Sequence, residues 1–201
     1  MSASAQPALL LWVDLETEGL DPLIHGVLEI AVAVTRFEAP YEVLHAWSSL
    51  IGGNARRRLL DGHEDAFIVD MHARSGLTEA LTKAPFAPTP PAVDKLLVDF
   101  LGSGDWPLNK NERAVLAGFS VDFDRRFLRQ HFPMLASVVS HRVFDISAFR
   151  LMLRSAGVEP PPRPAQAAHR AKDDLEAALS EARAIAARLS ALPKEAFAWT
   201  L

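Results

Sequence analysis

Residues 9–22, LLLWVDLETEGLDP, decide the fold of this 201-residue chain. Their first five residues are apolar and predict a buried strand, because a short apolar run that ends at polar residues is typical of one. Asp14 and Glu16 end the strand, and side chains two apart on a strand point to the same face. Two carboxylates on one face of a strand can together hold a hard cation. The D-x-E pattern is common, however, and taken alone it favours an ordinary polar strand end.

Two more strands follow. Residues 28–35, LEIAVAVT, are rich in β-branched side chains and predict a second strand, and residues 41–50, YEVLHAWSSL, predict a third. A turn that contains Glu38-Ala39-Pro40 joins them. Three consecutive strands predict an antiparallel meander at the start of the domain.

Helices then alternate with single strands. Residues 52–89 are mixed and leave room for short helices and loops, and apolar residues within 93–101 recur at helical spacing. The other predicted elements are a strand at 114–119, a helix around 123–128, a strand at 142–144, a helix at 145–155 stopped by Gly157, a proline-rich loop at 160–164 and a long helix at 175–189. This order predicts one α/β domain over residues 1–201, with a mixed sheet and a core from about residue 8 to 190.

Composition excludes several classes of protein. Hydrophobic residues make up 49% of the chain and charged residues 23%, as in ordinary globular proteins. No stretch is apolar enough to span a membrane, and no basic region precedes the first apolar run as in a signal peptide. The absence of cysteine excludes disulfides and thiolate metal sites. We therefore expect no membrane association and a location in the cytoplasm.

The formal net charge of −4 limits the kind of nucleic acid that the protein can bind. Tight binding to long nucleic acid depends on a basic surface that neutralises phosphates. A nucleic-acid substrate should therefore be short, or be held locally at a metal site. Two local basic runs exist, at 56–58 and at 125–129, and we interpret the first as solvated surface.

Two further segments supply side chains that can carry chemistry. Asp122 and Asp124 lie in a segment that Phe123 and Phe127 can anchor to the core, so one aspartate could face a cleft. Capping of the helix that starts there is the alternative role for either of them. Later in the chain, HRAKDD at 169–174 lies between the proline-rich loop and the last helix, and a cap at Asp173 is again the alternative.

Together these residues suit the hydrolysis of a phosphodiester. That reaction needs a nucleophilic water and a stabilised leaving oxygen, and two divalent cations about 3.5–4 Å apart provide both. Mg²⁺ and Mn²⁺ prefer oxygen ligands, which the aspartates and the glutamate supply. A histidine can accept the proton of the water near neutral pH.

As a set, the motifs resemble the DEDDh branch of the DEDD exonuclease superfamily. The three motifs of that branch match WVDLETEGLDP at 12–22, GFSVDFDRRFL at 118–128 and, for H-x4-D, HRAKDDLEAAL at 169–179. Three more segments are similar to the oligoribonucleases of that branch: LEIAVAVT at 28–35, VDMHARSGLTEAL at 69–81 and DFDRRFLRQHFPML at 122–135. The similarity covers most of residues 9–190.

The resemblance implies a ribonuclease-H-like fold, with a five-stranded mixed sheet flanked by helices. It implies hydrolysis from the 3′ end to 5′-mononucleotides with two divalent metal ions, Mg²⁺ or Mn²⁺. The implied metal ligands are Asp14, Glu16, Asp124 and Asp174, and the implied general base is His169. A homodimer is also implied, acting on short single-stranded nucleic acid with RNA favoured over DNA. Asp122 and Asp173 then become bystanders.

The same resemblance predicts substrate contacts by Leu20, Phe67, His72 and His141. Phe67 stands where the family has a tryptophan, and a phenyl ring can still stack on a base. His141 replaces a tyrosine that caps very short substrates from the partner subunit. Glu18 replaces a small or apolar residue and adds negative charge near the phosphates.

Two other functions fit the same motifs. A DNA-directed exonuclease of the proofreading type shares the first motifs, and a catalytically silent nucleic-acid-binding module could use the same fold. Every motif residue is present, which favours an enzyme. The residues that set substrate length are only partly kept, so the sequence supports an exonuclease more strongly than a dinucleotide-specific one.

Overall fold

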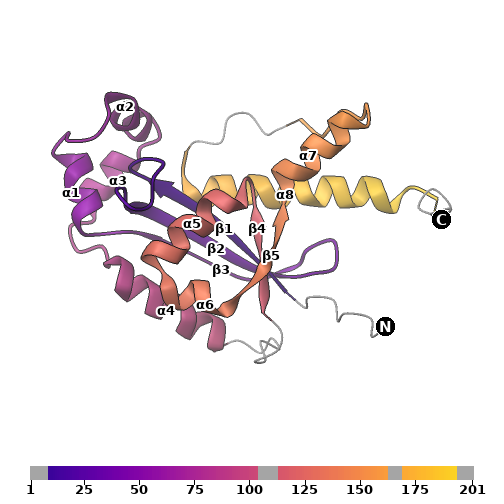
Figure 1. The fold of residues 1–201 in the computed structure, drawn as a ribbon, viewed down its shortest axis with the longest axis horizontal. Coiled ribbons are helices and arrows are strands. Elements are labelled where there is room, and N and C mark those ends of the chain that lie inside the picture. Colours follow the sequence, from indigo (N-terminus) through magenta and orange to yellow (C-terminus); the bar gives the residue numbers. More distant parts are fainter. Residues whose placement is uncertain (1–8, 104–112, 163–168, 194–201) are drawn as a thin grey trace.

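A computed structural model describes residues 9–103, 113–162 and 169–193, which form a mixed sheet with helices on both faces (Figure 1). The sheet has the strand order β3-β2-β1-β4-β5. The strands are β1 (Leu9–Thr17), β2 (Val27–Arg36), β3 (Val43–Leu50), β4 (Ala114–Gly118) and β5 (Val139–Asp145). β1 to β3 pair antiparallel, whereas β1, β4 and β5 run parallel. The predicted α/β class, mixed five-stranded sheet and opening meander are therefore confirmed.

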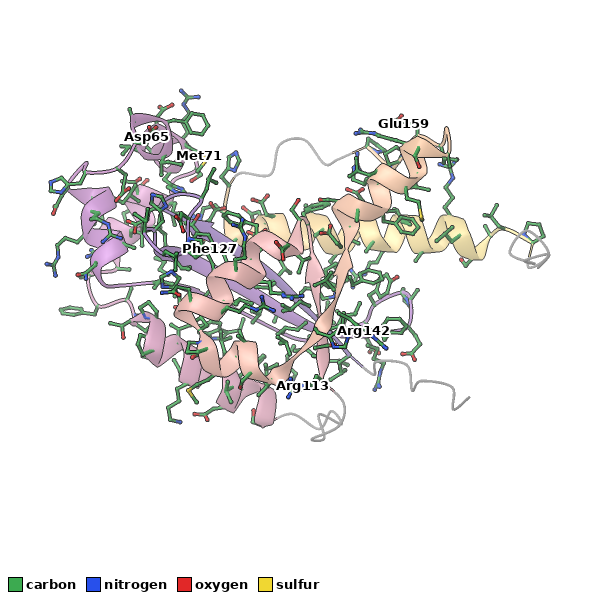
Figure 2. All side chains as sticks on the ribbon, viewed as in Figure 1. Asp65, Met71, Arg113, Phe127, Arg142 and Glu159 are labelled. Carbon is green, nitrogen blue, oxygen red and sulfur yellow. The ribbon has the colours of Figure 1, made fainter. Side chains whose placement is uncertain are left out.

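The later helices divide between the two faces of the sheet, whereas the first three pack together in a third apolar cluster with Leu28 of β2. The helices are α1 (Asn54–Leu60), α2 (Ala66–Arg74), α3 (Leu77–Lys83), α4 (Pro90–Gly102), α5 (Val121–His131), α6 (Pro133–Val138), α7 (Ile146–Ser155) and α8 (Ala171–Ser190). One apolar core lies between the sheet and α4, α5 and α6, and a second lies between the sheet and α7 and α8. Figure 2 shows Phe127, which belongs to the first core, on α5 where this helix crosses the sheet.

Strand β1 lies at the centre and alternates between these two cores. Leu11, Val13 and Leu15 belong to the core under α4 to α6, whereas Leu10 and Trp12 belong to the core under α8. Side chains alternate along a strand, so Asp14 and Glu16 continue the face that α8 covers. The strand runs on to Thr17, which makes both carboxylates part of a paired strand.

The third strand is shorter than the sequence predicts. It begins at Val43, because Tyr41 adopts a left-handed backbone (φ 56°) in the turn before it. The Tyr41 ring lies edge-on to Trp12, with centroids 6.0 Å apart, and to Phe144, at 5.8 Å. An apolar residue that seemed to belong to a strand thus fills the core from a turn.

The sequence also gave no sign of helix α6. Asp94, buried on α4, accepts hydrogen bonds from the backbone N–H groups of Met134 (2.9 Å) and Leu135 (2.8 Å). A carboxylate at the start of a helix satisfies N–H groups that lack partners inside it. The start of α6 therefore depends on a residue 40 positions earlier.

Some expectations fall outside the described residues. The predicted proline-rich loop at 160–164 extends into 163–168, which are not described. Among the residues that are described, none of the helices has the length and apolar character needed to cross a membrane. The cytoplasmic location and the limits of the domain stay predictions.

Replacing Asp94 by alanine should destabilise the fold. Two buried N–H groups at the start of α6 would lose their acceptor, at a cost of about 1–3 kcal/mol in the free energy of unfolding. Urea denaturation measures this change. The matched control is Asp99→Ala on the same helix, where the side chain is exposed and pairs with Lys95, and the expected change is below about 0.5 kcal/mol. Equal losses in both variants would contradict the role of Asp94.

Candidate active site

The carboxylates from the first two motifs meet because their strands are parallel neighbours. β1 and β4 pair in parallel, so their carboxyl ends lie at the same edge of the sheet. Asp14 and Glu16 lie on β1, and Asp124 lies in the first turn of α5, directly after β4. The Asp124 carboxylate accepts a hydrogen bond from the backbone N–H of Leu15, between the two β1 carboxylates. The first two motifs therefore form one cluster.

The third motif joins this cluster at the start of α8. Ligand atoms of Glu16, His169 and Asp174 lie within 4.8 Å of one another. Asp174 is in the first turn of α8, and its charge also acts on Asp14. His169 is exposed and has a left-handed backbone (φ 48°). The structure thus brings together all five residues that the resemblance singled out.

The cluster is strongly acidic, and the carboxyl groups resist ionisation. Burial raises the pKa of Glu16 to about 8, aided by the charges of Asp174 and Glu29 and opposed by Arg170. Burial likewise raises the pKa of Asp124 to about 8, although backbone N–H groups favour its charged form. The pKa of Asp14 is raised well above its ordinary value by burial and then by Asp124 and Glu16. Like charges in a site of low dielectric favour the protonated forms.

This donor set fits divalent cations. It consists of carboxylate oxygens and one imidazole, the ligand types that Mg²⁺ and Mn²⁺ accept. Several carboxylates with raised pKa values in one place lack compensating charge, and bound cations would supply it. Asp122 and Asp173 are both exposed, and the N-cap residues of their helices are Ser120 and Arg170 instead, whereas Asp124 accepts a hydrogen bond from its own backbone N–H in the first turn of α5.

An ion pair that the sequence did not reveal holds the third motif in place. Glu29 lies opposite Glu16 on the neighbouring strand β2. Its carboxylate accepts hydrogen bonds from Arg170 Nη2 (2.7 Å) and Nε (3.0 Å), and from the backbone N–H of Ala171 (3.0 Å). Glu29 thus caps α8 and fixes the residue that follows His169. The sequence did not predict this ion pair because it depends on the register between β1 and β2.

A second carboxylate, Asp145, fixes the helix that carries Asp124. It lies at the end of β5 and caps α7 through the N–H groups of Ser147 (2.8 Å) and Ala148 (3.1 Å). It also accepts hydrogen bonds from the N–H groups of Ser120 (3.2 Å) and Val121 (3.1 Å) at the start of α5. The sequence predicted a helix at 145–155 but neither of these roles of Asp145.

His72 occupies an unexpected position. Its ring is fully buried, and Nε2 donates a hydrogen bond to the carbonyl oxygen of Thr17 (2.9 Å). Its Nδ1 lies 3.9 Å from Glu16 Oε2, and burial lowers the pKa of the imidazole. These contacts join α2 to the end of β1. The predicted contact of His72 with a substrate stays a prediction.

The other predicted substrate residues divide between two places. Leu20 and Phe67 are exposed (73% and 71%) and line one groove of about 680 Å³, next to the end of β1. His141 is exposed on the outer strand β5, where its carbonyl oxygen accepts a hydrogen bond from Arg125. Its predicted contact with a substrate stays a prediction.

Glu18 does not add the free negative charge that the sequence suggested. Its side chain is buried, accepts a hydrogen bond from the backbone N–H of Gly26 (2.7 Å) and forms an ion pair with Arg58. Arg58 Nε also lies 3.2 Å from Glu64 Oε1. Arg58 is therefore not solvated surface, and Arg56 also differs from that expectation because its Nε donates to the carbonyl oxygen of Leu81 (3.0 Å).

Known proteins are similar to this chain in sequence and in fold. No family model matches the sequence. Curated relatives include oligoribonucleases from Photobacterium profundum, 32% identical over 145 residues (72% of this chain and 75% of the relative), and from Corynebacterium glutamicum, 31% identical over 153 residues (76% and 66%). Among solved structures, a full-length 3′-exonuclease has a TM-score of 0.59 at 16% identity, covering 92% of this chain and 62% of the other.

A second similar structure is the zinc-bound complex of Escherichia coli exonuclease I with single-stranded DNA. Its TM-score is 0.62 at 16% identity, over 92% of this chain and 42% of the other. This chain therefore spans less than half of the exonuclease I chain. At such low identity the similarity concerns the fold, which is the ribonuclease-H-like fold of the 3′-exonucleases.

The fold and the motifs define a 3′–5′ exonuclease of the DEDD superfamily. Within that superfamily, the chain belongs to the oligoribonuclease family. The expected class of enzyme is confirmed, and the silent-module alternative loses its support.

The metal-free protein should lose stability as the pH rises from about 4.5 to 8. Over this range the folded state keeps protons on Glu16 and Asp124 that the unfolded chain releases, so the free energy of unfolding falls. Thermal unfolding in EDTA at pH 5, 6, 7 and 8 measures the effect. Glu16→Gln should flatten the decline, whereas the exposed Asp122→Asn should leave it unchanged. Stability that increases towards pH 8 in EDTA would contradict the raised pKa values.

Proposed function

We propose that the protein removes 5′-mononucleotides from the 3′ ends of short single-stranded oligonucleotides, with RNA favoured over DNA. The observation that carries this proposal is the cluster of Asp14, Glu16, Asp124, Asp174 and His169 at the carboxyl ends of β1 and β4. The RNA preference rests on the oligoribonuclease relatives. The cytoplasm remains the compartment that we propose for this activity.

The four carboxylates would hold two divalent cations, Mg²⁺ or Mn²⁺. When bound, the cations supply a nucleophilic water at neutral pH and compensate the charge on the leaving oxygen. The protein contributes a rigid cradle, because Asp14 and Glu16 lie on a central strand and pair with Ala31 and Glu29 of β2. The Asp124 carboxylate is held by a hydrogen bond from the backbone N–H of Leu15. Such preorganised ligands need little rearrangement during the reaction.

His169 is the group that we assign to accept a proton from the attacking water. Its ring is exposed to solvent and within reach of the ligand atoms of Glu16 and Asp174. The pair of Glu29 and Arg170 holds the next residue, which limits where the ring can move. A general base must lie within hydrogen-bond reach of the proton that it takes.

The groove next to this cluster is where we place the bases of the substrate. Leu20 lies on the β1–β2 loop and Phe67 on α2, so two exposed apolar side chains face one groove from different elements. An aromatic ring stacks on any base, which suits an enzyme that degrades every sequence. The net charge of −4 gives no basic field for a long strand, which agrees with a short substrate.

A length series of oligonucleotides tests the proposal. Purified protein with Mn²⁺ or Mg²⁺ should release 5′-mononucleotides from RNA of two to ten nucleotides, and more slowly from matched DNA. Asp124→Asn should lower kcat by at least about 100-fold, because it removes a charge that acts in the transition state. Asp122→Asn, two residues away and exposed, is the matched control and should keep wild-type activity.

Each outcome of the length series has a clear meaning. Faster cleavage of DNA would favour the proofreading type of exonuclease, in line with the exonuclease I structures that contain single-stranded DNA. Identical results with metal and with EDTA would reject the metal-dependent site. Full activity of the Asp124→Asn variant would show that the site lies elsewhere.

A homodimer is the second part of the proposal. β5 is an outer strand of the sheet, and Val143 on it is exposed. Beside it, an apolar cavity of about 460 Å³ lies between β5, α7 and α8, with Phe149, Met152 and Leu189 in its lining. Met152 is 55% exposed. A second copy on this face would cover the apolar surface.

Disruption of this face should produce monomers. Met152→Glu places a charge on the apolar surface, and light scattering after gel filtration should then show 22.0 kDa instead of twice that mass. Leu96→Glu, at an exposed apolar position on α4, is the matched control and should remain dimeric. A wild-type mass of 22.0 kDa would reject the dimer.

A further inference from the structure

We propose that Arg58 determines how tightly the substrate is held, because it joins the two walls of the groove that Leu20 and Phe67 line. This inference rests on the proposed function of the groove. The name Arg58 bridge is used below for the set of Glu18, Arg58 and Glu64. Arg58 and Glu64 lie outside the three exonuclease motifs, and Glu18 lies within the first motif segment but is not one of the metal ligands that the resemblance implies.

The contacts of the Arg58 bridge connect two loops and a helix. From α1, Arg58 pairs with Glu18 through Nη2 and through Nε, which lies 3.1 Å from Glu18 Oε2. The same Nε lies 3.2 Å from Glu64 Oε1. Glu18 is 1% exposed and also accepts a hydrogen bond from the backbone N–H of Gly26 (2.7 Å). Both carboxylates line the groove, so one guanidinium fixes both of its sides.

The two anchored residues lie close in the chain to the side chains that face the groove. Glu18 comes two residues before Leu20, on the loop that leaves β1. Glu64 comes directly before Asp65, which caps α2 by accepting a hydrogen bond from the N–H of Phe67 (2.8 Å). Figure 2 shows Asp65 at the outer end of α2. A shift of either anchor would therefore move Leu20 or Phe67.

Leu20 and Phe67 depend on these anchors because they have little packing of their own. They are 73% and 71% exposed, so the core does not hold their side chains. The backbone around them sets the spacing between the walls of the groove. A substrate that binds to a preformed spacing avoids the cost of ordering both walls.

The Arg58 bridge also controls charge in the groove. Glu18, Glu64, Asp21 and Asp65 all line it, whereas the cations on its lining and on the bridge are Arg126 and Arg58. The guanidinium compensates two of these carboxylates. Without it, they would repel the phosphates of a substrate, since like charges a few ångströms apart interact strongly when they are partly buried. Loss of spacing and loss of charge compensation therefore both weaken binding.

Arginine suits this position better than lysine. Its planar group contacts two carboxylates at once, whereas an ammonium is a single compact charge. A bridge that served only for stability would affect all substrates and the melting temperature alike. A bridge that positions the groove should change KM and leave the chemical step unchanged, because the metal-binding carboxylates lie outside it.

The double variant Glu18→Gln with Arg58→Met tests the proposal without leaving the buried charge of Glu18 unpaired. KM for RNA of two and five nucleotides should rise about tenfold, a loss of about 1.4 kcal/mol in binding, while kcat stays within about twofold. The Kd for the same RNA, measured by fluorescence anisotropy in EDTA, should rise by a similar factor. Arg58→Lys should fall between the double variant and the wild type.

The matched control is Arg57→Met, which removes the neighbouring exposed arginine of the same helix and should leave KM and Kd unchanged. Glu64→Gln breaks one arm of the bridge and should raise KM by a smaller factor. It provides the test if the double variant does not fold. Unchanged KM and Kd in these variants, or equal losses in Arg57→Met, would overturn the proposal. An inert wild type would instead reject the proposed function.

Discussion

The structure depends on one constraint, the burial of several carboxylates along a single face of strand β1. Leu10 and Trp12 bury this face under α8, and Asp14 and Glu16 continue it to the end of the strand. Carboxylates in such a place cost free energy unless something compensates their charge. The raised pKa values of Asp14, Glu16 and Asp124 express that cost. Cations would compensate the mutual repulsion of these buried carboxylates, so a site of this kind favours cation binding.

Arginines compensate the acidic residues around this site and so define its boundary. Glu29 pairs with Arg170, and Glu18 pairs with Arg58. Both glutamates therefore serve structure: one holds the start of α8, and the other holds the loop after β1. The carboxylates of the three motifs remain in the centre, where Arg170 only moderates the pKa of Glu16. The carboxylates that pair with arginines hold the site together. The carboxylates that cluster without such partners are the ones that we propose to act in it.

Local patterns predicted the strands and most helices well. The apolar run at 9–13 and the alternation after it placed β1, and the β-branched run at 28–35 placed β2. The prediction was wrong where a distant residue decides the local structure. Helix α6 begins where Asp94 caps it, and Tyr41 leaves the strand pattern because its ring packs on Trp12. No window of sequence around residue 41 or 133 contains that information.

The sequence by itself determined the chemistry of the site, because the residue types and the spacing of the three motifs identify the family and the five clustered residues. Only the tertiary structure decided which other residues support them. Glu29 reaches Arg170 because of the register between β1 and β2, and Glu18 reaches Arg58 across 40 residues. The buried ring of His72 reaches the carbonyl oxygen of Thr17 across 55 residues. The partners in ion pairs and hydrogen bonds depend on which residues lie close together in the folded chain. The local sequence preference of a residue does not contain this information.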